Sequence, residues 1–242
     1  MNINLWIKNY RKRRKIQRVK PHFWHLNDAN LGYVQNYKVG TRSIRQALSL
    51  HLLQNLPENS GKEISYKEIT EEVEERFDKQ YSGFYMPETI RAKWADMSIF
   101  TFVRNPLSRL YSCYANKVLD ATEDGGKFPF AAFGMTPNTT FDEFVRIVAD
   151  TPDSHSERHF RSQTWFITAN GKLITDFIGK IENFNQDWEE LRGKHDLPVS
   201  PHNNQSSMGK TDFSDFYTKE TYRLAVDRFQ HDIEALGYEN DV

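Results

Sequence analysis

The residues with the clearest chemical potential form one short segment, Tyr37-Lys38-Val39-Gly40-Thr41-Arg42-Ser43. It lies between a predicted strand over Gly32–Tyr37 and a predicted helix over Ile44–Leu56. A helix N-terminus presents backbone N–H groups and the positive end of the helix dipole, which together attract anions. Gly40 would let the backbone approach a phosphate closely. The further donors are the side chains of Lys38, Thr41 and Ser43.

This segment differs from the usual nucleoside-triphosphate signature, GxxxxGK[ST]. Its lysine precedes the glycine, and no Gly-Lys-Ser/Thr end follows to hold Mg²⁺. A Lys-x-Gly-Thr-x-Ser string by itself also occurs in surface loops that bind nothing. The phosphate hypothesis therefore depends on a second element.

The second element is the crossing from strand to helix over residues 100–114, Phe-Thr-Phe-Val-Arg-Asn-Pro-Leu-Ser-Arg-Leu-Tyr-Ser-Cys-Tyr. Arg104 lies at the strand end, and Ser112 lies two helical turns further on. Arg109 comes one turn before Ser112, so the two share a helix face. Because a guanidinium donates two parallel hydrogen bonds, Arg104 and Ser112 are predicted to hold one phosphate, with help from Arg109. In the alternative interpretation Arg109 pairs with surface acids and Ser112 is incidental.

Together the two segments resemble the sulfotransferases that use 3′-phosphoadenosine 5′-phosphosulfate (PAPS). The resemblance is closest to the branch that holds the Golgi carbohydrate sulfotransferases and their shorter bacterial relatives. It implies that Lys38–Ser43 binds the 5′-phosphosulfate and Arg104–Tyr114 the 3′-phosphate. It spans residues 33–238, with weaker matches at Arg158–Gln163, Asp176–Glu182, Pro201–Ser206 and Asp232–Tyr238.

The resemblance implies transfer of a sulfuryl group from PAPS to a hydroxyl acceptor, here a carbohydrate, with 3′-phosphoadenosine 5′-phosphate (PAP) as the product. Such a reaction needs alignment of the attacking and leaving oxygens and stabilisation of charge on the leaving group. Lys38 would stabilise the bridging oxygen, and this scheme requires no metal. The phosphate would be held by backbone amides of Val39, Gly40, Thr41, Arg42 and Ser43.

The attacking hydroxyl needs a base, and histidine is the usual one near neutral pH. His159 is the first candidate, because it lies in the family-like segment Arg158–Gln163. A helix predicted over residues 156–168 would place His159 and Gln163 one turn apart. The rival bases are His155 and His202, and each of these histidines also has a purely structural interpretation.

Two other functions stay open on these residues. One is a P-loop kinase, for which Mg²⁺-dependent ATP turnover would be diagnostic, although the Gly-Lys-Ser/Thr motif is missing. The other is a non-catalytic carbohydrate- or membrane-binding module on the same fold, which would fail to bind PAP. The presence of Lys38, Arg104 and Ser112 argues against this second alternative.

Charge is distributed unevenly along the 242 residues. Eight basic residues lie between Lys8 and Lys20, and no acid precedes Asp28. The remainder carries 24 basic and 33 acidic residues, which argues against a nucleic-acid-binding domain. Residues 1–27 are predicted to form a basic N-terminal tail, either a solvated arm or a peripheral contact with an anionic membrane.

The compartment is predicted from cysteine and hydropathy. Cys113 is the one cysteine of the sequence, which excludes an intramolecular disulfide and a thiolate-rich zinc site. No apolar run approaches the roughly 18 residues that span a membrane. The Golgi relatives carry a membrane anchor and several cysteines, and this sequence differs from them in both respects. We therefore expect a cytoplasmic location.

The elements that must position these residues alternate between strands and helices, which predicts an α/β fold. We expect a P-loop-like, three-layer, doubly wound parallel sheet flanked by helices, in one domain over residues 28–242. The other predicted elements are a capped helix at Ser65–Gln80, a buried strand at Ser98–Val103, a helix onward to Leu119, a mobile loop at Asp120–Thr140, a strand at Leu173–Ile178 and a helix at Lys219–Leu236.

Overall fold

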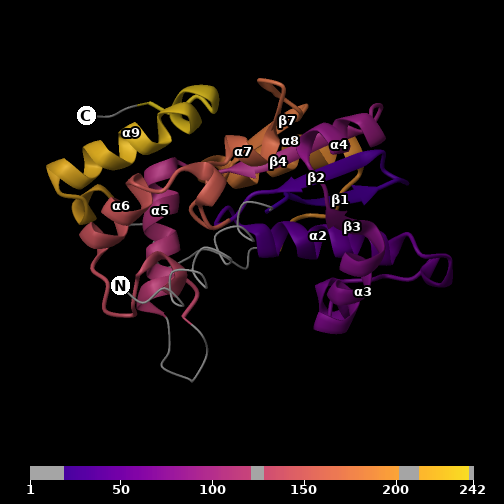
Figure 1. The fold of residues 1–242 in the computed structure, drawn as a ribbon. Helices are drawn as coiled ribbons and strands as arrows, with labels where there is room; N and C mark the ends of the chain where they lie inside the picture. The colour runs from indigo at the N-terminus through magenta and orange to yellow at the C-terminus, as the bar shows by residue number, and fades with distance from the viewer. Residues whose placement is uncertain (1–18, 121–127, 202–212, 240–242) are drawn as a thin grey trace, which may run out of the picture. The chain divides into compact units, whose positions relative to one another are not determined.

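The computed structural model describes residues 19–120, 128–201 and 213–239. The chain divides into two compact units, which we describe separately (Figure 1). The sheet unit holds the described residues of 20–104 and 166–201. The helical unit holds residue 19 and the described residues of 105–165 and 213–239.

The sheet unit is built on five strands in the order β3-β1-β2-β4-β7. Strand β1 pairs antiparallel with both neighbours, whereas β2, β4 and β7 pair in parallel. The predicted α/β class with helices around a mostly parallel sheet is confirmed, but one strand runs against the other four. The bounds are β1 His22–Leu26, β2 Leu31–Gln35, β3 Ser82–Phe84, β4 Ser98–Val103 and β7 Phe177–Lys180.

Strand β1 corrects the predicted extent of the tail. Residues 22–26 were assigned to the tail over residues 1–27, but they pair with residues 31–35 and lie in the sheet. Phe23 and Trp24 are both fully buried, although they point to opposite faces. Residues 22–26 lack the unbroken apolar run that predicts the strand at Ser98–Val103, because His22 and His25 interrupt it.

Helices cover both faces of the sheet (Figure 1). On one face α2, α3 and α8 pack over a core that includes Trp24, Tyr33 and Phe100. On the other face α4 approaches β1, where the rings of Phe23 and Trp94 lie 4.8 Å apart. The helices are α2 Thr41–Gln54, α3 Glu71–Tyr81, α4 Pro87–Lys93 and α8 Phe184–His195.

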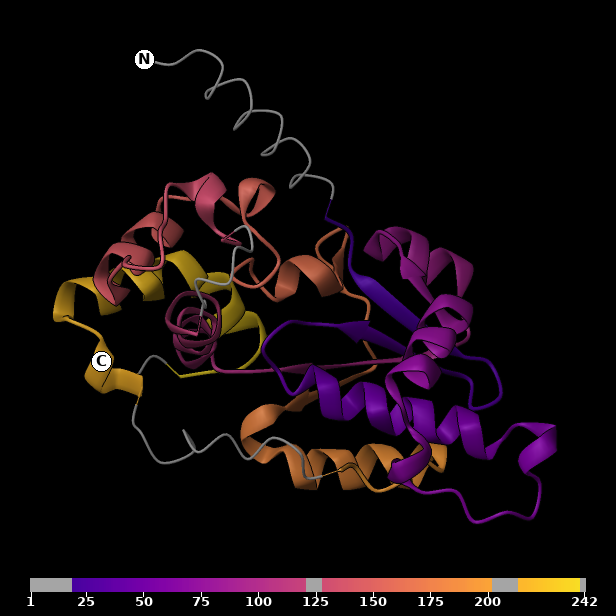
Figure 2. The ribbon, with the colours of Figure 1, turned by 90° about the horizontal axis from the view of Figure 1, so that it is seen from below.

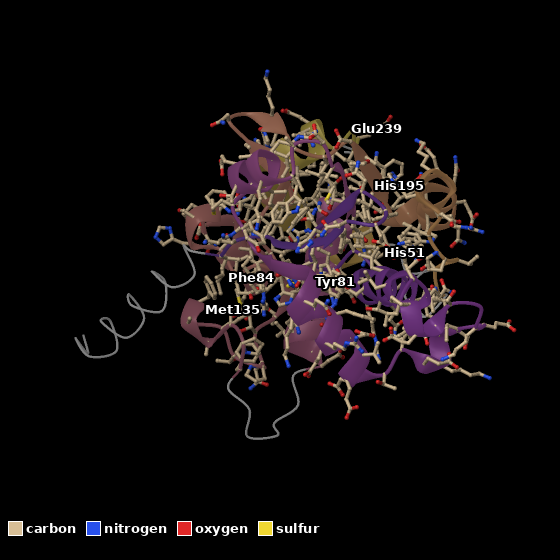
Figure 3. All side chains as sticks on the ribbon, turned by 90° about the vertical axis from the view of Figure 1, so that its right-hand side faces the viewer. His51, Tyr81, Phe84, Met135, His195 and Glu239 are labelled. Atoms are coloured by element: carbon tan, nitrogen blue, oxygen red, sulfur yellow. The ribbon has the colours of Figure 1, made fainter. Side chains whose placement is uncertain are left out.

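The edge strand β3 is short and follows α3 directly. It has three residues, and Phe84 at its end is 55% exposed while its ring stacks on His22 at 4.6 Å. Figure 3 labels Phe84 together with Tyr81, the last residue of α3. Such a short edge offers few backbone groups to another chain, which limits edge-to-edge pairing.

Two predicted elements of the sheet unit are split in the structure. The predicted helix at Ser65–Gln80 is split, because the capping box of Ser65 and Glu68 closes a single 3₁₀ turn and Thr70 caps α3 separately. The predicted strand over residues 173–178 is also split. Its first residue belongs to the hairpin of β5 (Thr168–Ala169) and β6 (Lys172–Leu173), and β7 begins at Phe177.

The helical unit packs α5, α6 and α9 around a second core (Figure 2, in which α5 is seen nearly end-on). The predicted helices after residue 105 and at 219–236 are confirmed. The helices are α5 Pro106–Tyr114, which continues as a π-helical segment Ala115–Leu119, α6 Phe141–Ala149 and α9 Lys219–Ala235. The short α7 (Thr164–Ile167) crosses from this unit to the sheet unit.

The predicted mobile loop at Asp120–Thr140 is packed where the structure describes it, and residues 121–127 lie outside the described part. Phe130 is fully buried among Phe144 and Phe160, and Thr140 caps α6 with a reciprocal bond from Glu143. The aromatic residues that the structure describes in this segment therefore belong to the core or pack against it. The remaining 3₁₀ turns are Pro57–Asn59, Tyr66–Glu68, Ala131–Phe133, Asp153–His155, Ile181–Asn183 and Phe213–Phe216.

Candidate active site

The loop after β2 is a tight turn with two left-handed residues. Both Lys38 (φ 68°) and Gly40 (φ 72°) adopt left-handed conformations. For a lysine this conformation costs energy, and such strain concentrates at functional sites. The hydroxyl of Thr41 donates to the carbonyl oxygen of Asn36 over 2.9 Å and closes the loop.

The N-terminus of α2 faces this loop. The helix is 14 residues long and begins at Thr41, three residues earlier than predicted. Gly40 stands at the cap position, no side chain bonds to the cap, and the first turn has no acidic residue. The first N–H groups of a helix have no partner within the helix, so this end is suited to an anion.

The loop is tied to the neighbouring strand through Asn36, a residue that sequence reasoning did not single out. Asn36 is fully buried, and its amide donates to Thr101 Oγ1 at 3.2 Å and to the Phe102 carbonyl at 3.4 Å. Thr101 in turn donates to the carbonyl of Val34 at 2.7 Å. The available signal was a polar residue directly after one predicted strand and a threonine within another, because buried polar groups are almost always hydrogen-bonded.

Arg104 lies at the same sheet edge as the loop. Tyr33 of β2 is in register with Phe100 of β4, and the strands are parallel, so the two chains leave the sheet at one level. The structure thus brings the segment 38–43 together with Arg104 in the sheet unit. Ligands of open parallel sheets bind at this carboxyl edge.

The six residues of segment 38–43 differ in exposure. Val39 is fully buried and Ser43 is 4% exposed, so their side chains pack inward. Arg42 is exposed, and Lys38 and Thr41 are half-buried. Val39 and Ser43 can therefore serve an anion through backbone N–H groups, whereas Lys38 and Thr41 also offer side-chain donors.

Arg109 has a different environment from the one predicted. It is 1% exposed, and its guanidinium donates to the backbone carbonyls of His159 (3.1 Å) and Arg161 (2.5 Å) within the helical unit. Burial lowers the pKa of Arg109 from its ordinary value. This burial argues against the predicted contact of Arg109 with a phosphate.

Ser112, the other helix residue predicted to bind phosphate, is half-buried on α5. Asn105 starts that helix, since its side-chain oxygen accepts from the N–H groups of Leu107 (3.0 Å) and Ser108 (3.1 Å). Ser112 belongs to the helical unit and Arg104 to the sheet unit. Their contact with one phosphate stays a prediction.

His159 lies in a turn and not in the predicted helix over residues 156–168, of which only Thr164–Ile167 is helical. The prediction that His159 and Gln163 lie one helical turn apart is therefore wrong. The physical reason is that other groups bind the backbone here. Arg161 donates to the Ser156 carbonyl (Nε at 3.2 Å, Nη2 at 2.6 Å), in place of an N–H group one turn further on.

The imidazole of His159 has a carboxylate partner. Its Nδ1 lies 2.8 Å from Glu157 Oε2, and the same oxygen accepts the backbone N–H of His159 at 2.7 Å. Burial lowers the pKa of His159, and Glu157 opposes that shift without cancelling it. A lowered pKa favours the neutral imidazole near pH 7, which is the form that a general base needs.

The rival histidines are less informative. His155 ends a 3₁₀ turn, and its Nδ1 lies 2.9 Å from the hydroxyl of Ser154. His202 and most of the segment Pro201–Ser206 lie outside the described residues. The base assignment stays a prediction.

Comparison with known proteins decides the family. The profile of the sulfotransferase family matches residues 21–239 of this chain. The chain belongs to the sulfotransferase family. The match begins one residue before β1, which supports the inclusion of that strand in the catalytic body.

The family placement lies near the carbohydrate branch. The sulfotransferase is 27% identical over 129 residues to carbohydrate sulfotransferase 14 of Mus musculus. That alignment covers 49% of this chain and 34% of the mouse protein, so the match spans about a third of the length of the relative. No solved structure matches the chain significantly.

Asp232 is a further residue that sequence reasoning did not assign to a role. It is fully buried on α9, and its carboxylate accepts from the N–H groups of Gln163 (2.7 Å) and Thr164 (2.9 Å) and from Thr164 Oγ1 (2.6 Å). It thereby fixes the chain just after the His159 turn.

Among the described helices, none is long and apolar enough to cross a membrane.

Proposed function

We propose that this sulfotransferase transfers a sulfuryl group from PAPS to a hydroxyl of a carbohydrate. The observation that carries the proposal is the shared sheet edge of the segment Lys38–Ser43 and Arg104. The carbohydrate acceptor is supported by the similarity to a relative that is named for carbohydrate sulfation. A free hydroxyl on a saccharide is the acceptor group we expect.

The chemistry of the loop fits a phosphosulfate. A left-handed turn at Gly40, an uncapped helix N-terminus and a first turn without acids favour a group with negative charge. We assign the 5′-phosphate to the N–H groups of residues 39–43. We assign the 3′-phosphate to Arg104 and Ser112, and we leave Arg109 out of that contact because it is buried.

Lys38 is proposed to act on the leaving oxygen. During transfer the acceptor oxygen forms a new bond to sulfur while the bond from sulfur to the bridging oxygen breaks. Negative charge then grows on the 5′-phosphate, and the ammonium of Lys38 stabilises it more in the transition state than in the ground state. Lys38→Ala should lower kcat strongly while PAP still binds, and a near-normal kcat would refute this role.

His159 is proposed to take the proton of the attacking hydroxyl. Its neutral imidazole at pH 7 is suited to this step. His159→Ala should lower kcat by about 10²–10⁴-fold with nearly unchanged PAP affinity. If the variant keeps most of the activity, the base is another group, and His155→Ala and His202→Ala would be measured next.

The test of the whole proposal is calorimetric. Wild-type protein should bind PAP without Mg²⁺, and Arg104→Ala should weaken binding by about 1.5–3 kcal/mol, the value of a charged hydrogen bond. Arg223→Ala, which removes an exposed arginine on α9, is the matched control and should bind PAP normally. Unchanged affinity of Arg104→Ala would remove the 3′-phosphate assignment.

The same samples separate the alternatives. Transfer from labelled PAPS to a panel of saccharides would establish the activity and identify the acceptor. Mg²⁺-dependent turnover of ATP would favour a kinase, and absence of PAP binding would favour a non-catalytic module. The cytoplasmic location stays a prediction that fractionation of cells expressing the full chain would test.

A further inference from the structure

The turn that carries His159 is held by two buried arginines and one half-buried arginine, all within the helical unit. Arg109 donates to the carbonyls of residues 159 and 161, and Arg161 donates twice to the carbonyl of Ser156. Arg228 adds bonds to Asp153 Oδ1 (2.6 Å), Ser156 Oγ (3.2 Å) and Ser162 Oγ (3.1 Å). Residues 153–162, which comprise a 3₁₀ turn and the chain after it, are thus fixed by seven hydrogen bonds from arginine side chains.

Glu157 occupies a defined place in this turn. Its Oε2 accepts both the backbone N–H of His159 (2.7 Å) and a hydrogen bond at His159 Nδ1 (2.8 Å). The two side chains are 20% and 18% exposed, so both are largely shielded from water. Because one oxygen binds both the backbone and the ring, the orientation of the imidazole is set relative to the turn.

A bond from Nδ1–H to a carboxylate has a chemical consequence. A neutral imidazole carries one proton, and a carboxylate can only accept. The proton therefore resides on Nδ1, and the lone pair resides on Nε2. The atom that can take a proton is then the one directed away from Glu157.

We propose that Glu157 is a positioning residue, which holds His159 in the Nδ1–H tautomer and makes Nε2 the atom that accepts the proton of the acceptor hydroxyl. This inference rests on the proposed role of His159 as the base. Glu157 acts through His159 and touches no reacting atom itself. The inference identifies Nε2 as the proton-accepting atom, whereas the proposal that His159 is the base does not say which ring nitrogen acts.

The charged groups around the pair give the inference a second observable. Burial of His159 lowers its pKa most, the carboxylate of Glu157 raises it, and Lys117 of the π-helical segment and the adjacent Arg158 lower it further. Burial acts in the opposite direction on Glu157 and raises its pKa, because the charged form of a carboxyl is the deprotonated one. The hydrogen bonds and charge attraction to His159 outweigh burial and leave the pKa of Glu157 below its ordinary value. At neutral pH the pair is therefore a carboxylate bonded to a neutral ring.

The first experiment needs only the wild-type protein. Long-range ¹H–¹⁵N correlation of ¹⁵N-histidine-labelled protein at pH 7.5 distinguishes the two tautomers, and the signals lost in His159→Gln identify the residue. We expect an Nδ1–H tautomer for His159. An Nε2–H tautomer in the wild type would overturn the inference.

The second experiment compares Glu157→Gln with Glu234→Gln, a matched change at an exposed position on α9. Glu157→Gln should lower kcat by about 10–100-fold, as for other carboxylates that orient a histidine, with the KM for PAPS within about twofold. Loss of the carboxylate lowers the pKa of His159, so the acidic limb of the kcat profile should move to lower pH. A merely structural role would leave that limb in place, and this result would overturn the inference.

The outcomes separate the inference from the function on which it rests. Full activity of His159→Ala would overturn the base assignment, whichever tautomer the wild type shows. Loss of activity in His159→Ala together with an unchanged pH limb in Glu157→Gln would overturn the positioning role alone. Glu234→Gln should match the wild type in every measurement.

Discussion

Asp232→Asn is a change for which the structure predicts a large loss of stability. The carboxylate is fully buried and accepts three hydrogen bonds, two from the N–H groups of Gln163 and Thr164 and one from Thr164 Oγ1. The variant has the same size but only one carbonyl oxygen. Its NH₂ group then faces a backbone N–H, so at least one buried donor loses its acceptor.

The magnitude follows from these contacts. A hydrogen bond to a charged group contributes about 1.5–3 kcal/mol, and an unsatisfied buried donor costs about 1–3 kcal/mol. Because the three bonds share one carboxylate, their contributions do not add fully. We expect Asp232→Asn to lower the free energy of unfolding by about 2–4 kcal/mol.

The assay is urea unfolding followed by circular dichroism at pH 7. With a urea m-value of about 2 kcal/mol/M, the midpoint should fall by roughly 1–2 M. Asp227→Asn, at an exposed position on the same helix, is the control and should stay within about 0.5 kcal/mol of the wild type. If Asp232→Asn also stays within that range, the three bonds are not what holds the chain at Gln163.

Three further predictions concern the loop, the buried ion pair and the tail. Gly40→Ala should weaken PAP binding and destabilise the fold by about 1–2 kcal/mol, because φ at this position is 72° and the new methyl group would lie 2.9 Å from Ile181 Cδ1. Normal PAP affinity of the variant in calorimetry would contradict a role of this turn in binding. The Asp153–Arg228 pair holds the pKa of Asp153 below its ordinary 3.8 in spite of burial. The unfolded chain therefore binds the proton more readily, and stability is lost as the pH falls below about 4. The Tm of Asp153→Asn should depend less on pH between 3 and 6 than that of the wild type, and an equal dependence would refute the assignment. Deletion of residues 1–18 spares β1 and removes seven basic residues. The deletion should leave turnover of a soluble acceptor intact and weaken binding to anionic vesicles at low salt. Equal vesicle binding with and without these residues would count against a membrane role of the tail.

The local segments of this protein could be predicted from the sequence alone. Strand β4 at Ser98–Val103, the cap of Ser65 and Glu68, and the long C-terminal helix depend on residues close together in the chain. The same holds for the place of the segment Lys38–Ser43 between a strand and a helix, whereas its role as an anion site stays a prediction. These features need only periodicity, caps and turn residues, which short sequences specify.

Tertiary structure decided where the remaining polar groups lie. Arg109 follows a surface-like pattern in the sequence, yet it is buried and donates to carbonyls fifty residues away. Asp232 binds the chain at Gln163, and Asn36 binds β4. A buried polar group requires a partner but does not specify its position in the chain, so only the folded molecule reveals the pairs.

The sequence therefore determined in which order the main elements occur, and the phosphate-binding residues that it suggests stay a prediction. It did not determine that β1 joins the sheet, because His22 and His25 interrupt the apolar run that would mark a buried strand. Nor did it determine the Glu157–His159 pair, since residues two apart approach each other in a turn and not in the helix that the local pattern predicted. In both cases long-range packing fixed a backbone conformation that the local sequence left undecided.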